Sequence, residues 1–259
     1  MKLLVLSITM IAAMNLFAAS QVSEVNIEEV FVAPKGYDSN DNVEIIVDGK
    51  LPNACYELYK TETKIVNFNI YVKQYIKIKQ ISECRPENQS QQTTPLWPVQ
   101  FTKRVEIGEL KTGLYSIIYN SNFIEKMKKF EVTKSISNSI DDDLYAPVSN
   151  AFIPELIYST SNAEVILTGI MTNTCMSFQG DVKVIRHNNV FIILPRMTIH
   201  RNRTCMDTME PLQYIVSLGE IQKEGRYLIH VRSTTGRSVN KLFSVKKSPF
   251  DPTGRRFNK

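Results

Sequence analysis

The chain has 259 residues, a formal net charge of +5 and four cysteines. Its length suits two domains of ordinary size, each large enough to enclose its own hydrophobic core. Basic and acidic residues balance between residues 21 and 134. The excess of positive charge therefore belongs to the C-terminal half, and we expect no nucleic-acid partner.

The N-terminus has the pattern of a secretory signal peptide over residues 1–20. Lys2 precedes an apolar stretch at residues 3–17, and the small residues 18–20 suit a cleavage site before Gln21. A membrane anchor is the alternative, but the stretch is interrupted by polar residues and is short for about 30 Å of hydrocarbon. The first cysteine is Cys55, too far away for a lipid anchor. We expect a periplasmic or secreted protein with no transmembrane segment in the mature chain.

A duplicated pattern runs through the rest of the sequence. The matched segments are 43–49 with 163–169, 53–55 with 173–175, 105–110 with 216–221, 113–118 with 225–231, and 130–132 with 243–245. The offset between the copies falls from 120 to 113, which places the differences in length in loops. The pattern predicts two related folding units.

The four cysteines divide evenly between the two copies. Cys55 and Cys84 are separated by 29 residues, and Cys175 and Cys205 by 30. A zinc site would need thiols at short spacing, and these are far apart in sequence. In an oxidising compartment the pattern predicts two disulfides, Cys55–Cys84 and Cys175–Cys205.

The elements are predicted to be almost entirely strands. Polar and apolar residues alternate at 75–79 and at 181–185, as in half-buried strands. Asn188 and Asn189 then indicate a tight turn into a strand at 190–194. Gly113 and Gly225 each precede a strand and suggest a turn with positive φ. Residues 122–129 fit either one helical turn or, preferably, a hairpin loop.

Several short strands per unit, with one disulfide each, favour an all-β fold of two tandem β-sandwich domains. The layout resembles the broad class of immunoglobulin-like domains in exported bacterial proteins. This resemblance depends on Gly-x-x-x-Asn-x-Cys, a second Cys, Leu/Ile-Gly-Glu-Leu/Ile and Gly-x-Tyr. The chain departs from antibody-type domains, because its cysteines are closer together and its single tryptophan, Trp97, lies outside the cysteine pair.

These features give the expected organisation. The segments are a signal peptide (1–20), a first β-sandwich domain (21–134), a linker (135–150), a second β-sandwich domain (151–247) and a basic, flexible tail (248–259). The linker is rich in Ser, Asn and Asp, so we expect it to be exposed, although Leu144 and Tyr145 could dock it.

The sequence gives little support for catalysis. The three histidines, His187, His200 and His230, lie in the second copy, and no hydrolase or metalloprotease motif accompanies them. We place His230 in a strand, facing solvent or a polar neighbour. The second copy is also rich in methionine, which suits copper(I) but is more often core filling. We therefore expect no enzymatic activity, no cofactor and no metal.

Candidate binding residues lie where the two copies differ. Arg196, Arg201 and Arg203 lead into Cys205, and Arg186 borders the predicted hairpin turn, so these arginines could share one end of the second sandwich. Such a cluster suits an anionic partner, with an ordinary solvated loop as the alternative.

Trp97 lies between Pro95 and Pro98, which exclude it from a central strand. Its indole either plugs one end of the first sandwich or is exposed as an anchor for a ligand. We favour packing, because tryptophan is usually mostly buried.

Together these patterns favour a non-enzymatic exported binding or structural module, contacting a protein or anionic envelope component through its second domain. A periplasmic chaperone or assembly factor, similar in outline to two-domain pilus chaperones, is the alternative. Inhibition of an exported enzyme is a third possibility, and an enzyme or a copper-binding protein fits less well.

Overall fold

The computed structural model describes residues 22–79, 97–200, 202 and 204–248. The predicted signal peptide, Cys84, Arg201, Arg203 and the tail beyond Ser248 lie outside these residues. The described part of the chain is all-β and has no helix. It accordingly holds no apolar helix of the length needed to cross a bilayer.

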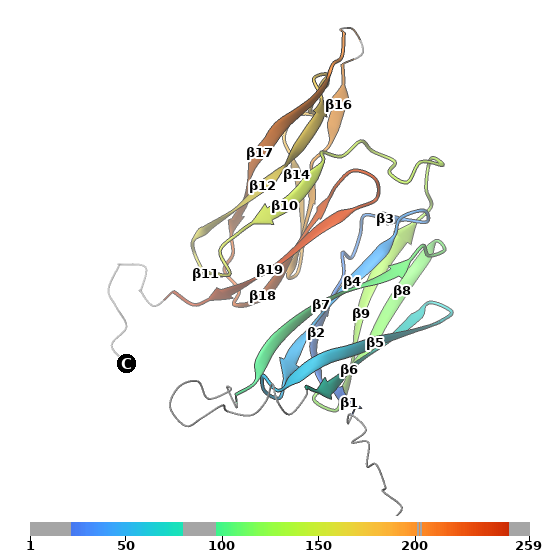
Figure 1. The fold of residues 1–259 in the computed structure, drawn as a ribbon, viewed down its shortest axis with the longest axis vertical. Coiled ribbons are helices and arrows are strands. Elements are labelled where there is room, and N and C mark those ends of the chain that lie inside the picture. Colours follow the sequence, from blue (N-terminus) through green and yellow to red (C-terminus); the bar gives the residue numbers. More distant parts are fainter. Residues whose placement is uncertain (1–21, 80–96, 201, 203, 249–259) are drawn as a thin grey trace, which may run out of the picture.

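The described residues form nineteen strands in two halves (Figure 1). The first half contains β1 (Val22–Val25), β2 (Ile27–Phe31), β3 (Tyr37–Asp38), β4 (Val43–Leu51), β5 (Tyr56–Val66), β6 (Asn69–Ile78), β7 (Val99–Gly108), β8 (Gly113–Ser121) and β9 (Ile124–Thr133). The second half contains β10 (Val148–Phe152), β11 (Leu156–Tyr158), β12 (Asn162–Asn173), β13 (Met176–Phe178), β14 (Lys183–His187), β15 (Val190–Leu194), β16 (Met197–Ile199), β17 (Asp207–Glu220), β18 (Gly225–Arg232) and β19 (Ser238–Lys246).

Each half contains a three-stranded sheet and a larger one. In the first half these are the β4 sheet, with order β2-β4-β7, and the β8 sheet, with order β1-β6-β8-β9-β3 and β5 paired to β6. In the second half they are the β12 sheet, β10-β12-β17, and the β18 sheet, β11-β19-β18-β15-β14. Strands β13 and β16 form a separate pair.

The pairings in the two halves correspond closely. The parallel pair β6 and β8 has its counterpart in β15 and β18, and the parallel pair β3 and β9 in β11 and β19. The antiparallel hairpin β8–β9 corresponds to β18–β19. Apart from β1 and the β13–β16 pair, which have no counterparts, the two strand sets share one pattern of pairing, in which a parallel contact links distant strands of the larger sheet.

Glycines 49 and 169, which the matched segments share, lie where another strand approaches closely. A Cβ on Gly169 would stand 1.9 Å from the carbonyl oxygen of Pro147, and one on Gly49 would stand 2.9 Å from that of Asn26. In both halves this approach accompanies a shift of register in the neighbouring pair, between β10 and β12 and between β2 and β4. A glycine is needed because a side chain would collide with backbone atoms.

Several turns follow the sequence prediction. Asn188 has a φ of 53° and joins β14 to β15 in a tight hairpin, as its amide side chain permits. Asn122 and Phe123 both have positive φ and form the turn between β8 and β9, so a hairpin is correct. The predicted loop 122–129 is too long, because residues 124–129 belong to β9.

The turn prediction holds for Gly225, whose φ is 144°, but not for Gly113. Gly113 has no positive φ; instead a Cβ there would stand 2.3 Å from the ring of Phe68. It provides space for packing and not conformational freedom.

The β18 sheet is covered on both faces. Along β18, Tyr227, Ile229 and Val231 enter the core of the second half, whereas Leu228 joins the core of the first half. Strand β15 divides in the same way, with Val190, Ile192 and Leu194 in the core of the first half. The two halves therefore pack against each other, with β18 and β19 facing β4 and β7 (Figure 1).

The linker is only partly exposed. Its first part is open to solvent, with the Asp142 carboxylate accepting hydrogen bonds from the amides of Ile136 and Ser137. Tyr145 and Ala146 are buried, and the amide of Met197 donates to the carbonyl of Leu144. The linker is therefore exposed in its first part, as expected, and docked in its second part at Leu144 and Tyr145, as the alternative had it, where its backbone pairs with residues 195–197.

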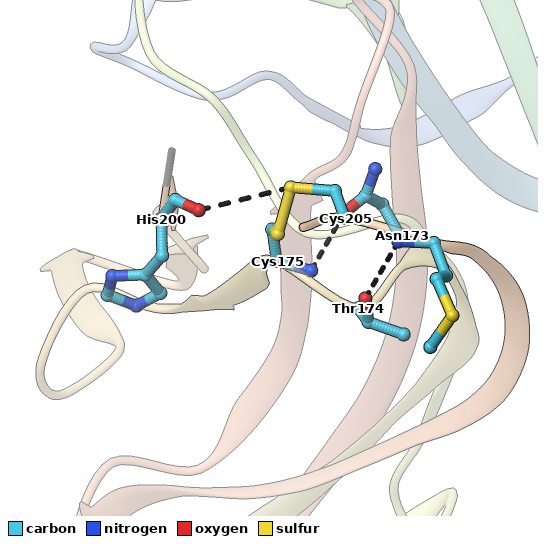
Figure 2. Close-up of a disulfide and its surroundings, with 6 residues drawn as sticks. Asn173, Thr174, Cys175, His200 and Cys205 are labelled. Atoms are coloured by element: carbon cyan, nitrogen blue, oxygen red, sulfur yellow. Dashed lines mark hydrogen bonds between the residues drawn. A yellow bond between two sulfur atoms is a disulfide. The ribbon is translucent and has the colours of Figure 1, made fainter. Parts of the chain in front are cut away.

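The disulfide Cys175–Cys205 is present, with a Cα–Cα distance of 5.3 Å (Figure 2). The Asn173 side chain accepts a hydrogen bond from the Cys175 amide at 2.7 Å, which forms a turn in front of the cysteine. Asn53 does the same for Cys55 at 2.9 Å. The predicted Cys55–Cys84 disulfide lies partly outside the described residues.

Candidate functional site

A group of buried or partly buried ionisable side chains lies between the two halves. Alternate residues of β4 face the second half, and alternate residues of β18 face the first, because successive side chains of a strand point in opposite directions. The polar members of this interface cluster are, from the first half, Asp41, Glu44 and Asp48 and, from the second, Arg226, His230 and Arg232.

Arg232 forms the most buried ion pair of the cluster. Its guanidinium donates to the Asp41 carboxylate and lies 3.3 Å from Asp141 of the linker. The side chains of Arg232 and Asp41 are 4% and 0% exposed. Burial lowers the pKa of Arg232, but the hydrogen bond and charge of Asp41 outweigh it, so the pKa is raised. The pair joins both halves to the linker.

His230 lies next to this pair and is held neutral. Its Nδ1 is 2.9 Å from Oδ1 of Asn240, and its ring packs edge-on against Tyr37 at 5.7 Å between centroids. Burial lowers the pKa of His230 to about 4, although the hydrogen bond to Asn240 opposes the shift. The nearby Arg232 and Arg104 guanidiniums lower it further. A general base at neutral pH would need access to substrate, and this ring is 2% exposed.

The two acidic residues on β4 are also enclosed. Glu44 accepts hydrogen bonds from Arg104 and Asn240, and burial nevertheless raises its pKa. Asp48 accepts from Thr102 at 2.9 Å and lies 2.8 Å from Arg226, and burial raises its pKa too. Each carboxylate therefore interacts with residues of both halves.

An open cleft of 560 Å³ lies at one end of this junction. Its lining residues come from both halves and are Glu28, Glu29, Phe31, Asp48, Lys128, Arg186, Asn188, Asn189, Lys223, Glu224, Gly225, Arg226 and Tyr227. Lys128 is paired with Glu29, and Arg226 with Asp48. Among the described residues, Arg186 and Lys223 are the cleft cations without an ion pair.

Arg186 is held in place by aromatic rings and forms no ion pair with a carboxylate among the described residues. Its guanidinium lies over the rings of Phe191 and Tyr227, at 5.2 and 6.0 Å from their centroids. It donates one hydrogen bond, of 3.4 Å, to the carbonyl of Glu220. Stacking on aromatic rings leaves most donors of a guanidinium available. With Lys223 and the Asn188 and Asn189 amides, it can bind an anionic group.

Arg196 does not share this site. Its guanidinium pairs with Asp143 at 2.7 Å beside the linker. Arg186 lies opposite Phe191 at one end of β15, and Arg196 follows the other end, roughly 16 Å away along the strand. The structure therefore separates two of the four arginines expected at one end of the second half. Arg201 and Arg203 are outside the described residues.

Trp97 is 67% exposed at the start of β7, and the expectation that its indole plugs the first half is wrong. As expected from its flanking prolines, Trp97 lies outside the strand, since β7 begins two residues later. Its exposed indole is compatible with the alternative, a ligand anchor.

The methionines of the second half are divided between its core and its surface, and His200 is hydrogen-bonded. Met197 is buried, and Met171 and Met176 pack against the core of the second half, as gap-filling residues do. Met206 and Met209 are exposed. His200 Nε2 is 2.6 Å from the Ser177 hydroxyl. No cluster of three or more His, Cys, Asp or Glu suited to a metal occurs among the described residues.

The sequence prediction missed the interface cluster, although its signal was present. Strand β15 is an uninterrupted apolar run, which indicates a strand buried on both faces. Along β18, Arg226, His230 and Arg232 occupy alternate positions around Leu228, so the second buried face had to accommodate charge. Such a face implies acidic partners, which β4 supplies at Glu44 and Asp48.

The described residues thus contain a largely buried polar cluster, which joins the two halves and reaches an open cleft at Asp48 and Arg226, and the same cleft holds a stacked arginine, Arg186. No protein-family model, curated protein or solved structure matches the chain.

Proposed function

We propose that the chain is a non-enzymatic exported binding or structural protein made of two related immunoglobulin-like β-sandwich units. The corresponding strand pairings of the two halves support this relation, because duplicated sequence and duplicated topology then have one origin. Export is supported by the signal-like residues 1–20 and by the Cys175–Cys205 disulfide, which suits an oxidising compartment.

One observation favours a binding role over catalysis. Shifted pKa values often mark active sites, and in this cluster burial lowers that of His230 and raises those of Glu44 and Asp48, which lie between the halves with hydrogen-bonded or charged partners. His230, Glu44 and Asp48 are each 4% exposed or less. A substrate cannot reach His230 or Glu44 without separating the halves, and Asp48, which lines the open cleft, is paired with Arg226 there. We infer that the role of the three groups is to hold the units together.

We further propose that the open cleft binds an anionic group through Arg186. The stacked guanidinium is ordered by Phe191 and Tyr227 before a ligand arrives, which reduces the entropy lost on binding. Lys223 adds a second cation, and the hairpin amides of Asn188 and Asn189 add neutral donors. A sulfated or carboxylated envelope polysaccharide, or an acidic protein segment, has the matching charge.

Titration calorimetry with dextran sulfate and with alginate tests this proposal. The Arg186→Gln variant should bind either polyanion about tenfold or more weakly than the wild type, because a charge-assisted contact is removed. Arg237→Gln is the matched control, since Arg237 is exposed and lies outside the cleft. Equal binding by the wild type and Arg186→Gln, or equal loss in both variants, would contradict a site at Arg186.

A periplasmic assembly factor is the second candidate. Two observations favour it: the halves are joined by buried contacts, and the 14-residue strand β17 pairs with a single neighbour, β12, among the described residues. A long edge strand can accept a strand from a client. Suppression of aggregation of an unfolded client by the wild type, lost when a proline replaces Gln213 in β17, would favour this role over the cleft.

A further inference from the structure

The outer face of the β12 sheet carries an apolar row that crosses all three strands. Phe152 on β10 is in register with Ile166 on β12, and Ile166 is in register with Ile215 on β17. Phe152 is 65% exposed and Ile215 56%. An exposed and continuous apolar row of this kind indicates an interaction surface, because isolated apolar side chains are the usual case on a protein surface.

The first half has the first two members of this row, and there they are buried; the third position, on β7, is Arg104. Phe31 on β2 is in register with Ile46 on β4, and these residues are 2% and 4% exposed. Ile46 corresponds to Ile166 in the matched segments 43–49 and 163–169, and Phe31 occupies the position of Phe152 in register. One Phe–Ile pair is thus covered in the first half and open in the second.

The cover over the first pair identifies what should cover the second. Val190, Ile192 and Leu228 of the β18 sheet belong to the same apolar cluster as Phe31 and Ile46. Within one chain, the face of the β18 sheet that carries Leu228 is covered by the β4 sheet. The counterpart of the β18 sheet by topology, the β8 sheet, has its outer face uncovered among the described residues.

The β8 sheet carries a matching apolar row on that outer face. Tyr71 on β6 is in register with Ile118 on β8, and Ile118 is in register with Met127 on β9. Tyr71 is 40% exposed and Met127 55%. Lys64 on β5 lies beside Tyr71, at the end of the row. Two uncovered rows of similar composition therefore remain, one on each half.

The open β12 sheet face lacks basic residues, as the β4 sheet face does at its centre, whereas the open β8 sheet face carries charges of both signs. Inside the chain, acidic residues of the first half meet basic residues of the β18 sheet. Strands β10, β12 and β17 contain no Lys or Arg, and Glu164, the counterpart of Glu44, is exposed on the outer face. The β8 sheet presents Lys64 and Lys129 without an ion pair among the described residues, and Glu125 and Glu131, likewise without one there, lie on opposite sides of the row.

We propose that a second copy of this chain docks the outer face of its β8 sheet on the outer face of the β12 sheet, as the β18 sheet docks on the β4 sheet within one chain. The two faces differ, so the contact is head-to-tail, and each added copy leaves one face of each kind open for the next. The inference uses the proposed relation between the halves and does not involve the Arg186 cleft, so either proposal can fail without the other.

Sedimentation of the purified full chain at increasing concentration, up to about 1 mM, tests this proposal. The wild type should form species larger than a dimer. Phe152→Asp and Met127→Asp, each an exposed position on one of the two faces, should each weaken association about tenfold or more. Ile136→Asp, at an 86% exposed position of the linker, is the control and should behave as the wild type.

Mixing the two variants distinguishes the occupants of the face. A Phe152→Asp copy retains its β8 sheet face, and a Met127→Asp copy retains its β12 sheet face, so the mixture should form a 1:1 dimer that does not grow. A wild type that stays monomeric throughout overturns the proposal. A dimer that Phe152→Asp abolishes and Met127→Asp leaves intact also overturns it, because the β12 sheet face would then bind itself.

Discussion

His230 shows how the packing of the two halves alters the chemistry of one side chain. Its ring is enclosed by Tyr37 and Glu44 from the first half and by Asn240 and Arg232 from the second, with Arg104 nearby. A charged imidazole would be buried among guanidiniums there, so the neutral form is strongly favoured. His230, which the sequence placed in a strand facing solvent or a polar neighbour, is a buried, neutral member of the interface with Asn240 as its polar neighbour.

This environment predicts a dependence of stability on pH. The pKa of His230 falls from 6.5 to about 4 on folding, so between these values the unfolded chain binds the proton and the folded chain does not. Stability is therefore lost as the pH falls from about 6.5 to about 4. The contribution of this one residue is about 3 kcal/mol, from 1.36 kcal/mol per pH unit.

The measurement is urea unfolding of the wild type and His230→Gln at several pH values. The difference between the two proteins at pH 7.5 removes the effect of the substitution on packing. Below that pH the wild type should lose more stability than His230→Gln. Asp38, whose pKa burial raises to about 6, acts in the opposite direction in both proteins. Parallel curves for the two proteins would contradict a buried, neutral His230.

At the scale of strands, the local patterns predicted more than the contacts between elements. Alternation and turn residues placed the β14–β15 hairpin and the all-β class, because these depend on neighbouring residues. The parallel pairing of β15 with β18 joins distant residues, which no local pattern specifies. The apolar character of Tyr145 suggested docking, but the sequence did not identify Arg196 as its partner. Sequence analysis placed four arginines at one end of the second half, although the predicted strand at 190–194 already separates Arg186 from Arg196.

The Cys175–Cys205 disulfide gives a prediction at the same scale. It closes a segment of 30 residues that contains β13 to β16. Replacing both cysteines with alanine should lower the free energy of unfolding by about 3–4 kcal/mol, because the unfolded chain regains the entropy of the open loop. Thermal unfolding of the double variant measures the loss. A control is available in Met209→Ala, an exposed position near the disulfide; equal stability of the double variant and the wild type would be inconsistent with a structural role.

For the whole molecule, the two halves use corresponding sheets in different ways. The β4 sheet is filled by the second half, and the β12 sheet remains open, although both carry a Phe–Ile pair in register. The buried ionisable groups lie at the junction of the halves. The surfaces that stay exposed are the cleft with the stacked Arg186 and the two apolar rows. This distribution is the physical basis for a binding protein and for its proposed self-association.

The most direct test of this account is a double-mutant cycle between Asp41 and Arg232, which lie on different halves and form the buried ion pair. Asp41→Asn, Arg232→Met and the double variant are compared with the wild type by urea unfolding at pH 7.5. Each single change should cost about 3–5 kcal/mol, because it leaves one buried charge unpaired. The double variant should cost less than the sum by at least about 1 kcal/mol. Strictly additive losses, or single variants as stable as the wild type, would contradict a largely buried polar cluster joining the two halves.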